Sequence, residues 1–332
     1  MWKIGLIPIE GKVVLAPMAG ITNVAYRKFM KSFGVALSYT EMVSDCGLIY
    51  KNQETYRYLQ TDEEDRPIAV QLFGGTKETL LKGLKCLEES GQAYDILDIN
   101  LGCPVVKVIK TGAGSAWLKR PQELYEMMKA IVEASKKPVT AKIRLGWDET
   151  SINVREVVQL LEQAGVSMIA IHARTRAQLY SGNARFELLR GLRSEMHIPL
   201  VVSGDIFSLE DAIRVQEETQ ADAVMVARGA MGNPHLIRQI DHYFRTGEKL
   251  ANISLQKNLT YLERHFQMLC ELKGEVIAVR EMRGIAPHYL KGYPNTKQDR
   301  MYLASSLVTA DDFYRAIERI RKNATIYEEK HV

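Results

Sequence analysis

The stretch DILDINLGCP at residues 95–104 indicates a buried strand that ends in a chemically active turn. Its apolar residues over 96–100 suit a strand that is covered on both faces, as strands in parallel sheets are. Gly102 lets the backbone turn freely and Pro104 stiffens the exit, so Cys103 is expected at the mouth of the strand. A free cysteine is most often a small core residue, and a catalytic interpretation therefore needs support from the other strands.

Seven further apolar segments of similar length occur along the chain. Segments with helical spacing of apolar residues lie between many of them, for example at residues 76–90. This alternation predicts parallel strands joined by helical crossovers, and eight such units predict an α/β fold, a closed (β/α)₈ TIM barrel. The strand candidates are residues 13–17, 36–42, 68–73, 96–100, 139–144, 168–172, 200–205 and 223–228.

The pattern changes after about residue 245. Residues 255–272 and 310–327 have helical patterns, and no β-branched run there is long enough for a strand. We therefore expect two domains, a catalytic barrel at residues 1–245 and a helical domain at residues 246–332. Within the barrel, residues 51–66 are polar and irregular, which predicts a surface excursion.

Composition limits the class of protein. The chain has 332 residues with 46% hydrophobic and 25% charged side chains, typical of a soluble protein, and its net charge of +4 allows a polyanionic partner. Four scattered cysteines without a C-x-x-C pair suggest no disulfide framework and no metal site, so a cytoplasmic location is expected. No apolar run approaches the ~18 residues that span a bilayer, and residues 1–11 make a poor signal peptide.

Polar residues recur where the predicted strands end. In a barrel of this type the active site forms at the carboxyl ends of the strands. Lys142 and Arg144 are informative because a buried strand does not normally carry cations unless they have partners. Contributions from so many strand ends are poorly explained by stability alone. The residues at these ends are Pro17, Met18, Gln71, Asn100, Cys103, Lys142, Arg144, His172, Arg174, Ser203, Gly204, Asp205 and Arg228.

The last two strand ends suggest what is bound. Residues 203–205 and 228–229 follow the seventh and eighth strands, where barrels often bind phosphate, and glycine lets backbone N–H groups approach phosphate oxygens. A phosphate-bearing cofactor with an electron-accepting ring would use the remaining groups. Lys142 could neutralise electron density on the reduced ring, Gln71 could hydrogen-bond its edge, and His172 could orient it.

Taken together, these segments resemble the tRNA-dihydrouridine synthases, and among them the bacterial B-type branch. The resemblance extends over the whole chain, with departures at Ala173 and Ala227, where glycine is common, and at residues 284–287. The matching segments are APMAGITN at 16–23, VQLFG at 70–74, NLGCPV at 100–105, KIRLGW at 142–147, HARTRAQ at 172–178, SGDI at 203–206 and MGNP at 231–234.

The resemblance implies a barrel that holds FMN, which NADPH or NADH reduces. The reduced flavin would pass hydride to C6 of a uridine in the tRNA D-loop, and Cys103 would protonate C5. The uridine must leave its stack to reach the flavin. Asn100, Arg144 and Arg174 would face the uridine or its surroundings. The residues implied to contact the flavin are Pro17, Met18, Ala19, Gln71, Lys142, His172, Ser203, Gly204, Asp205, Ala227 and Arg228.

The tail offers a candidate contact for tRNA. Lys291, Lys297 and Arg300 cluster with two tyrosines within residues 291–302. Mixed basic and aromatic residues suit phosphate contact and base stacking, although a small charge bias is often only a solvated helical face. We hypothesise that the three cations bind tRNA. The sequence gives no sign of an obligate protein partner.

Two other functions remain open from the sequence. One is a flavin-dependent barrel oxidoreductase on free pyrimidines, similar to dihydroorotate dehydrogenase, in which the thiol would remove a proton. The mildly basic helical tail argues against it. The other is a non-catalytic RNA-binding protein that kept the fold, and the retention of Cys103, Lys142 and His172 argues against that.

Overall fold

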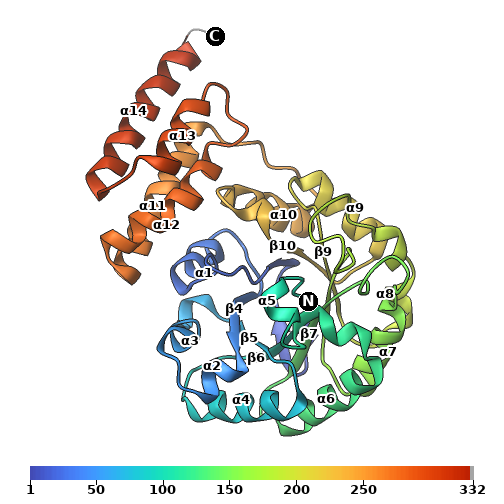
Figure 1. Cartoon of the computed structure of the whole chain (residues 1–332). Coiled ribbons are helices and arrows are strands. Elements are labelled where there is room, and N and C mark those ends of the chain that lie inside the picture. The colour runs from blue at the N-terminus through green and yellow to red at the C-terminus, as the bar shows by residue number, and fades with distance from the viewer. Residues whose placement is uncertain (330–332) are drawn as a thin grey trace.

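Eight parallel strands form the centre of the protein in the computed structural model, which describes residues 1–329. Figure 1 shows them enclosed by helices. The predicted α/β barrel is confirmed, with strand ends close to those expected. The strands are β3 (Val13–Leu15), β4 (Ser38–Ser44), β5 (Ile68–Phe73), β6 (Ile96–Leu101), β7 (Val139–Arg144), β8 (Ile169–His172), β9 (Leu200–Ser203) and β10 (Ala223–Val226).

The sheet order is β3-β10-β9-β8-β7-β6-β5-β4, so the first two strands of the barrel stand at its two edges. An isolated parallel bridge between Val14 and Leu37 joins these edges. The N–H of Leu15 donates to the carbonyl of Leu37 at 2.9 Å, and the N–H of Ala36 donates to the carbonyl of Val13 at 2.8 Å. These bonds close the sheet into a barrel.

Helices connect successive parallel strands, and the longer ones each bury one apolar face. In α4 the predicted stripe is present, since Leu80, Leu84 and Leu87 are buried. The helix α1 begins after Asn23, whose side-chain oxygen accepts the N–H of Tyr26. The helices of the barrel are α1 (Val24–Lys31), α2 (Asp45–Ile49), α3 (Gln53–Arg57), α4 (Lys77–Glu89), α5 (Val106–Ile109), α6 (Pro121–Ala134), α7 (Val154–Gln163), α8 (Leu192–Glu195), α9 (Leu209–Thr219) and α10 (Pro234–Thr246).

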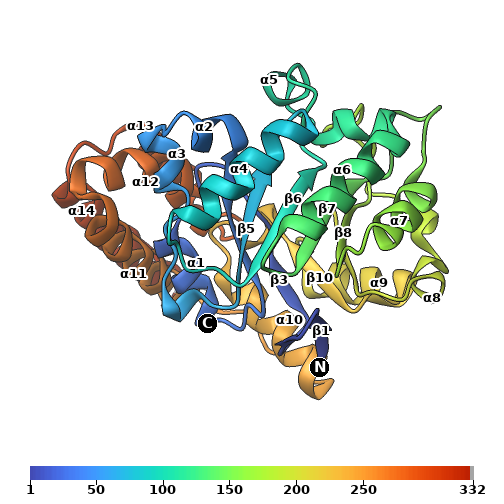
Figure 2. The same cartoon turned by 90° about the horizontal axis from the view of Figure 1, so that it is seen from below.

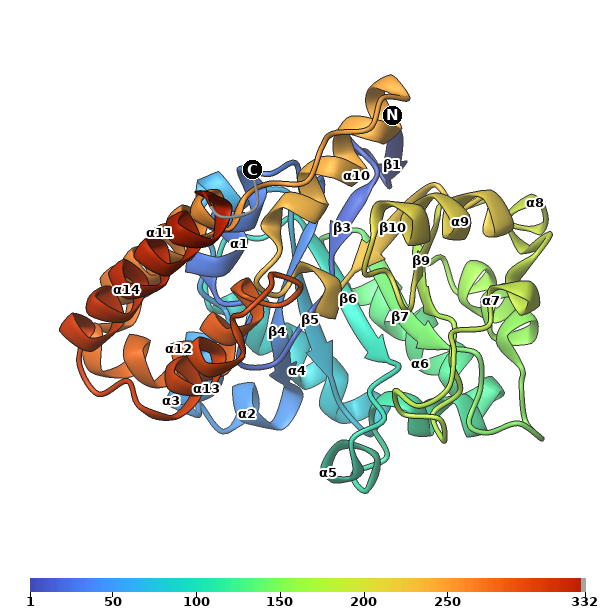
Figure 3. The ribbon, with the colours of Figure 1, turned by 90° about the horizontal axis from the view of Figure 1, so that it is seen from above.

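A short antiparallel hairpin, β1 (Trp2–Ile4) and β2 (Ile7–Ile9), precedes the barrel. The buried Ile4 and Ile9 belong to the same apolar cluster as the barrel residue Val201. Figures 2 and 3 place the hairpin at the end of the barrel opposite to α5. The sequence analysis gave these residues no structure, because strands of three residues are too short to show a period.

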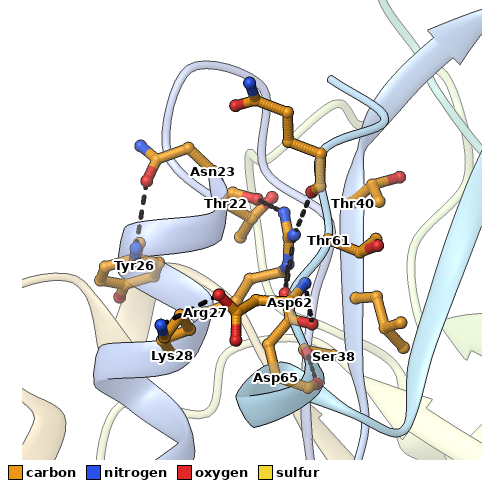
Figure 4. Close-up of polar contacts among 12 residues, drawn as sticks. Thr22, Asn23, Tyr26, Arg27, Lys28, Ser38, Thr40, Thr61, Asp62 and Asp65 are labelled. Atoms are coloured by element: carbon orange, nitrogen blue, oxygen red, sulfur yellow. Dashed lines mark hydrogen bonds and ion pairs between the residues drawn. The ribbon is translucent and has the colours of Figure 1, made fainter. Parts of the chain in front are cut away.

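The segment 51–66 is more ordered than the sequence analysis expected. It contains α3 and a 3₁₀ turn (Glu63–Asp65), and it ends with a fully buried Asp65. This carboxylate pairs with the buried Arg27 at 2.7 Å, as Figure 4 shows. Arg27 also donates to the carbonyls of Thr22 and Gln60. Because an unpaired buried charge is costly, the pair fastens this segment to α1.

Four helices complete the described chain, α11 (Leu255–Lys273), α12 (Glu275–Tyr289), α13 (Lys297–Ser305) and α14 (Ala310–Glu329). The sequence analysis expected α11 and α14 but not the two between them. In α12, Gly284 and Pro287 weaken the helical pattern. The helix α11 packs on α1, where the ring of His265 stacks on Phe29 with centroids 5.2 Å apart. Figure 3 shows the four helices beside α1–α3 and away from α6–α9.

Across residues 1–329, no helix combines the length and the apolar character needed to cross a bilayer.

Candidate active site

A cavity of about 420 Å³ opens at the carboxyl ends of the barrel strands. Its size lies within the range of about 300–1,000 Å³ that is usual for ligand sites. Most of the residues proposed from the sequence line it, although they come from six different strand ends. These residues are Pro17, Met18, Ala19, Asn100, Cys103, Lys142, Arg144, His172, Ser203, Gly204, Asp205, Ala227 and Arg228.

Strand register explains why these side chains gather. Lys142 is the partner of Asn100 across β6 and β7, and Arg144 is the partner of His172 across β7 and β8. His172 is in turn the partner of Ser203 across β8 and β9. Since residues two apart on a strand share one face, these positions form rows on the inner side of the barrel.

Cys103 is buried at the edge of the cavity, with 7% of its surface exposed. Its backbone N–H donates to Oδ1 of Asn100 at 2.9 Å, and so does that of Gly102 at 3.1 Å. Burial raises the pKa of the Cys103 thiol, although the N–H of Val105 and the charges of Arg144 and Lys142 oppose this. The thiol is therefore protonated at neutral pH and can donate a proton.

A buried hydrogen-bond chain supports Asn100 from below. Nδ2 of Asn100 donates to Oε1 of Gln71 at 2.8 Å, and Nε2 of Gln71 donates to Oδ2 of Asp98 at 2.7 Å. The hydroxyl of Thr140 donates to the other Asp98 oxygen at 2.6 Å. Gln71, Asp98 and Thr140 are partners in register across β5, β6 and β7. The chain fixes the amide that holds the Cys103 turn.

Gln71, predicted from the sequence to contact the cofactor, is fully buried and is not part of the cavity lining. Its amide is bonded to Asn100 and Asp98. The sequence analysis missed Asp98 and Thr140. A signal was present, because Asp98 stands two residues before Asn100, and Thr140 two residues before Lys142, on the same inward side of each strand.

Two cations that form no ion pair within 4 Å with the described residues make the cavity electropositive. Burial and the neighbouring Arg144 lower the pKa of Lys142 to about 8, although the charge of Asp98 opposes this. Arg144 is 2% exposed and donates to the carbonyls of Gly102, Thr175 and Leu179. Burial lowers its pKa to about 10, so it stays charged at neutral pH. A ligand with negative charge or electron-rich atoms is favoured here.

His172 is neutral in this environment. Burial lowers its pKa well below the usual value, and the charges of Arg144, Lys142, Arg174 and Arg228 lower it further. Its Nε2 lies 3.4 Å from Nη1 of Arg174. The imidazole therefore contributes hydrogen bonding and shape rather than charge.

Arg174 lies behind the cavity wall and lines a neighbouring groove instead. It is 1% exposed, donates to Asp205 at 2.5 Å, and donates to the carbonyls of Ser181 and Gly182. Burial opposes the charge of Asp205, but the bonds from Arg174 and from the N–H of Ala184 outweigh it and lower the pKa of Asp205. The resemblance implied that Arg174 faces the uridine or its surroundings. In the structure its hydrogen bonds hold the loop at residues 178–182.

Two glycines let the loops after β9 and β10 pack closely. At Gly204, with φ of +132°, an added Cβ would lie 2.7 Å from Cβ of Ala184. At Gly229 it would lie 2.0 Å from the carbonyl oxygen of Ile206. The backbone N–H groups, the hydroxyl of Ser203 and the guanidinium of Arg228 form a donor set of the kind that binds phosphate.

Two exposed aromatic residues at the cavity mouth were missed by the sequence analysis. Tyr180 is 53% exposed and Phe207 is 46% exposed. The guanidinium of Arg228 lies over both rings, 4.8 Å from the centroid of Tyr180 and 5.4 Å from that of Phe207. Neither residue stands at the end of a predicted strand, where the sequence indicates ligand-binding residues.

The predicted tail cluster lies apart from this cavity. Lys291, Lys297 and Arg300 line one shallow pocket of about 430 Å³ between α12 and α13, together with Met301. The structure thus brings the three cations together with one another but not with the barrel site. Within residues 1–329, no group of three or more His, Cys, Asp or Glu side chains is placed to hold a metal ion.

A closed (β/α)₈ barrel with a cation-lined cavity at its carboxyl end and a protonated thiol at the edge defines a barrel enzyme for an anionic ligand. A family model described as dihydrouridine synthase matches residues 14–325. The chain belongs to the dihydrouridine synthase family and is thus a flavin-dependent oxidoreductase.

Curated relatives agree with this assignment. The chain is 36% identical over 301 residues to the "Probable tRNA-dihydrouridine synthase" of Rickettsia conorii, covering 90% of each chain. It is 37% identical over 298 residues to the "tRNA-dihydrouridine synthase B" of Pseudomonas aeruginosa, covering 90% of this chain and 89% of the relative. These similarities put it in the B-type branch, as the sequence analysis expected.

Solved structures share the fold at low identity. One is the 6-hydroxypseudooxynicotine amine oxidase of Pseudomonas geniculata N1, with a TM-score of 0.55 and 13% identity, covering 78% of this chain and 51% of that chain. Another is the histamine dehydrogenase of Rhizobium sp. 4-9, with a TM-score of 0.53 and 14% identity, covering 80% and 50%. These similarities support the barrel fold alone.

Proposed function

We propose that this protein is a tRNA-dihydrouridine synthase of the cytoplasm that uses FMN and NADPH. It reduces the C5–C6 double bond of a uridine in the tRNA D-loop. The observation that carries the proposal is the buried, protonated thiol of Cys103 on the edge of a cavity that also contains the unpaired ammonium of Lys142. One cavity of ligand size thus contains both a proton donor and a cation that can stabilise an electron-rich ring.

The residues of the cavity fit FMN. Its phosphate suits the donors of Ser203, the Gly204 loop and Arg228, and its ring suits the ammonium of Lys142, which has no partner among the described residues. His172, Ala227 and the segment 17–19 would complete the wall around it. When bound and reduced by NADPH, the flavin supplies the hydride for C6 of the uridine.

Cys103 supplies the proton that C5 requires. Its thiol is protonated because burial raises its pKa. After proton transfer, the charges of Arg144 and Lys142 and the N–H of Val105 stabilise the thiolate. A proton from solvent then restores the thiol. The fixed turn at Gly102 and Cys103 holds the sulfur in place throughout, so little orientation has to be gained during the reaction.

The three residues proposed for substrate binding have different roles. Arg144 lines the cavity beside Cys103, and we assign it to the uracil carbonyls. Both amide atoms of Asn100 are engaged within the chain, so we assign it to positioning the Cys103 turn. Arg174 acts through Asp205 and the loop at 178–182. Tyr180 and Phe207 at the mouth suit stacking of an extruded base.

The helical region would supply further affinity for tRNA. Lys291, Lys297 and Arg300 surround one shallow pocket and suit contacts with backbone phosphates. This assignment is independent of the cavity chemistry, because the cluster lies outside it.

The test uses the purified protein with transcribed tRNA. We expect yellow flavin absorbance, oxidation of NADPH faster than of NADH, and dihydrouridine located by nucleoside mass spectrometry. Reduction of free uridine or orotate without activity on tRNA would support the free-pyrimidine alternative instead. A colourless protein that binds tRNA would support the non-catalytic alternative.

A further inference from the structure

A second cavity, of about 450 Å³, lies beside the active site between the barrel and the helical region. We call it the side cavity, and its lining includes Asn23, Glu41, Arg57, Tyr58, Gln60 and Lys273. The loop after β3 separates it from the main cavity. Gly20 of this loop lines the side cavity, whereas Met18 and Ala19 line the main one.

Asn23, which lines the side cavity, carries an unpaired buried donor. Its Oδ1 caps α1 by accepting the N–H of Tyr26 at 3.0 Å, as Figure 4 shows. The cap fixes the oxygen toward the helix, so Nδ2 faces away from it. The side chain is 8% exposed, and Nδ2 is buried with no hydrogen-bond partner among the described residues. A buried donor of this kind calls for an acceptor from a ligand or a water.

Glu41 brings an acceptor to the same space. It is 5% exposed, and its Oε2 accepts the N–H of Gly20 at 2.5 Å. The other oxygen forms no hydrogen bond, and the carboxylate no ion pair within 4 Å, within the part of the chain that the structure describes. Burial raises the pKa of Glu41, while the Gly20 hydrogen bond and the charge of Lys273 oppose this. The next residue, Met42, lines the main cavity, so β4 contributes side chains to both the side cavity and the main cavity.

The mouth of the side cavity adds a cation and an aromatic ring. The exposed Arg57 forms no side-chain hydrogen bond or ion pair with the described residues. Tyr58 is half-buried and donates to Glu54 at 3.1 Å. Lys273 is paired with Glu281. The side cavity is thus lined by a free guanidinium, a ring, a buried donor and a buried acceptor. These are elements with which proteins hold an unstacked nucleotide.

We propose that the side cavity binds a second, unpaired nucleotide of the tRNA, with a guanine base, while the target uridine occupies the main cavity. This rests on the proposed function. Guanine presents a carbonyl oxygen for the amide of Asn23, and N–H and amino donors for the carboxyl of Glu41, which lines the same cavity. Arg57 contacts the phosphate, and the ring of Tyr58 flanks the base.

Occupation of both cavities would select the modified position. The two cavities share one loop wall, so the number of nucleotides between the guanosine and the uridine is limited by the chain that joins them. A uridine at the wrong spacing cannot reach Cys103 while the guanosine is bound. The side cavity is thus a specificity site rather than a further catalytic one.

The first test replaces the free amide while keeping the helix cap. In Asn23→Ser the hydroxyl caps α1 about as well as asparagine, but the Nδ2 donor is lost. We expect unchanged Tm and unchanged flavin reduction by NADPH, with KM for tRNA raised about tenfold and kcat retained. The matched control is Asn52→Ser, which alters the cap of α3 outside the side cavity lining. An unchanged KM in Asn23→Ser would overturn the proposal.

The second test identifies the base. Transcripts carry inosine, which lacks the 2-amino group, in place of one D-loop guanosine at a time. We expect one such transcript to raise KM for the wild type but not for Glu41→Gln, which keeps an acceptor for Gly20 and loses the charge. Equal KM for every transcript would overturn the proposal. Absence of dihydrouridine with the unmodified transcript would instead defeat the proposed function, so the two failures are distinct.

Discussion

The barrel mouth and the α12–α13 pocket both present basic residues, but in opposite physical settings. Lys142 and Arg144 are held inside the barrel, where burial lowers their pKa values and neither forms an ion pair within 4 Å with a carboxylate of the described residues. Lys291 and Lys297 are exposed on the helical surface. Charges act strongly in a low-dielectric site, whereas salt screens exposed charges. From this difference we expect Lys142 and Arg144 to act on cofactor binding and on the reaction, and Lys291 and Lys297 to contribute an affinity for tRNA that falls as the salt concentration rises.

The largest effect should follow from removing the thiol at the barrel mouth. We expect Cys103→Ala to lower the rate of dihydrouridine formation by about 10²–10⁴-fold, because a positioned general acid is lost. Flavin content, tRNA affinity and flavin reduction by NADPH should stay at wild-type values. Stopped-flow kinetics and nucleoside mass spectrometry measure these steps. Cys46→Ala on α2 is the matched control, and an active Cys103→Ala would move the proton donor elsewhere.

The second effect concerns the charge of Lys142. Its pKa is about 8, so the ammonium is present below that pH and is lost as the pH rises through it. We expect the Kd of FMN to rise on the order of tenfold between pH 7 and pH 9. Fluorescence titration of the flavin-free protein measures it. In Lys142→Met the affinity should be weak and flat across this range, and a persistent step near pH 8 would assign it to another group.

The third effect tests the exposed region. Neutralising Lys291, Lys297 and Arg300 to Ala should weaken tRNA binding and reduce the slope of log K against log salt by about three, one for each phosphate contact. The value of kcat with saturating tRNA should be retained. A control that neutralises Lys82, Lys85 and Lys129 on the outer helices α4 and α6 removes the same charge. An equal loss in both variants would mean that only net charge matters.

The smallest effect concerns stability and the buried chain under Asn100. Burial raises the pKa of Asp98 to about 6, so the folded protein binds a proton that the unfolded chain releases between about pH 4 and pH 6. This group therefore costs stability as the pH rises through that window, on the order of 3 kcal/mol. We expect Asp98→Asn to flatten the pH dependence of urea unfolding there. Parallel wild-type and variant curves would contradict this.

Apolar periodicity was enough to predict the barrel. Parallel strands buried on both faces are short continuous apolar runs, and all eight were visible as such. The β1–β2 hairpin was missed because its strands are too short to carry a period. The inward pairing of Arg27 with Asp65 was missed because an ion pair between residues far apart in the chain leaves no periodic pattern in the sequence.

By itself the sequence determined the order of strands and the polar residues that end them, since both depend on local spacing. Only the tertiary structure decided which of those residues reach open space. The sequence predicted that Gln71 contacts the cofactor and that Arg174 faces the uridine or its surroundings. In the structure Gln71 is hydrogen-bonded to Asp98 on the neighbouring strand, and Arg174 to Asp205 in the loop after β9. A buried polar side chain forms hydrogen bonds with the groups that the fold places next to it. Those groups are often far away in the sequence, so the sequence alone does not reveal them.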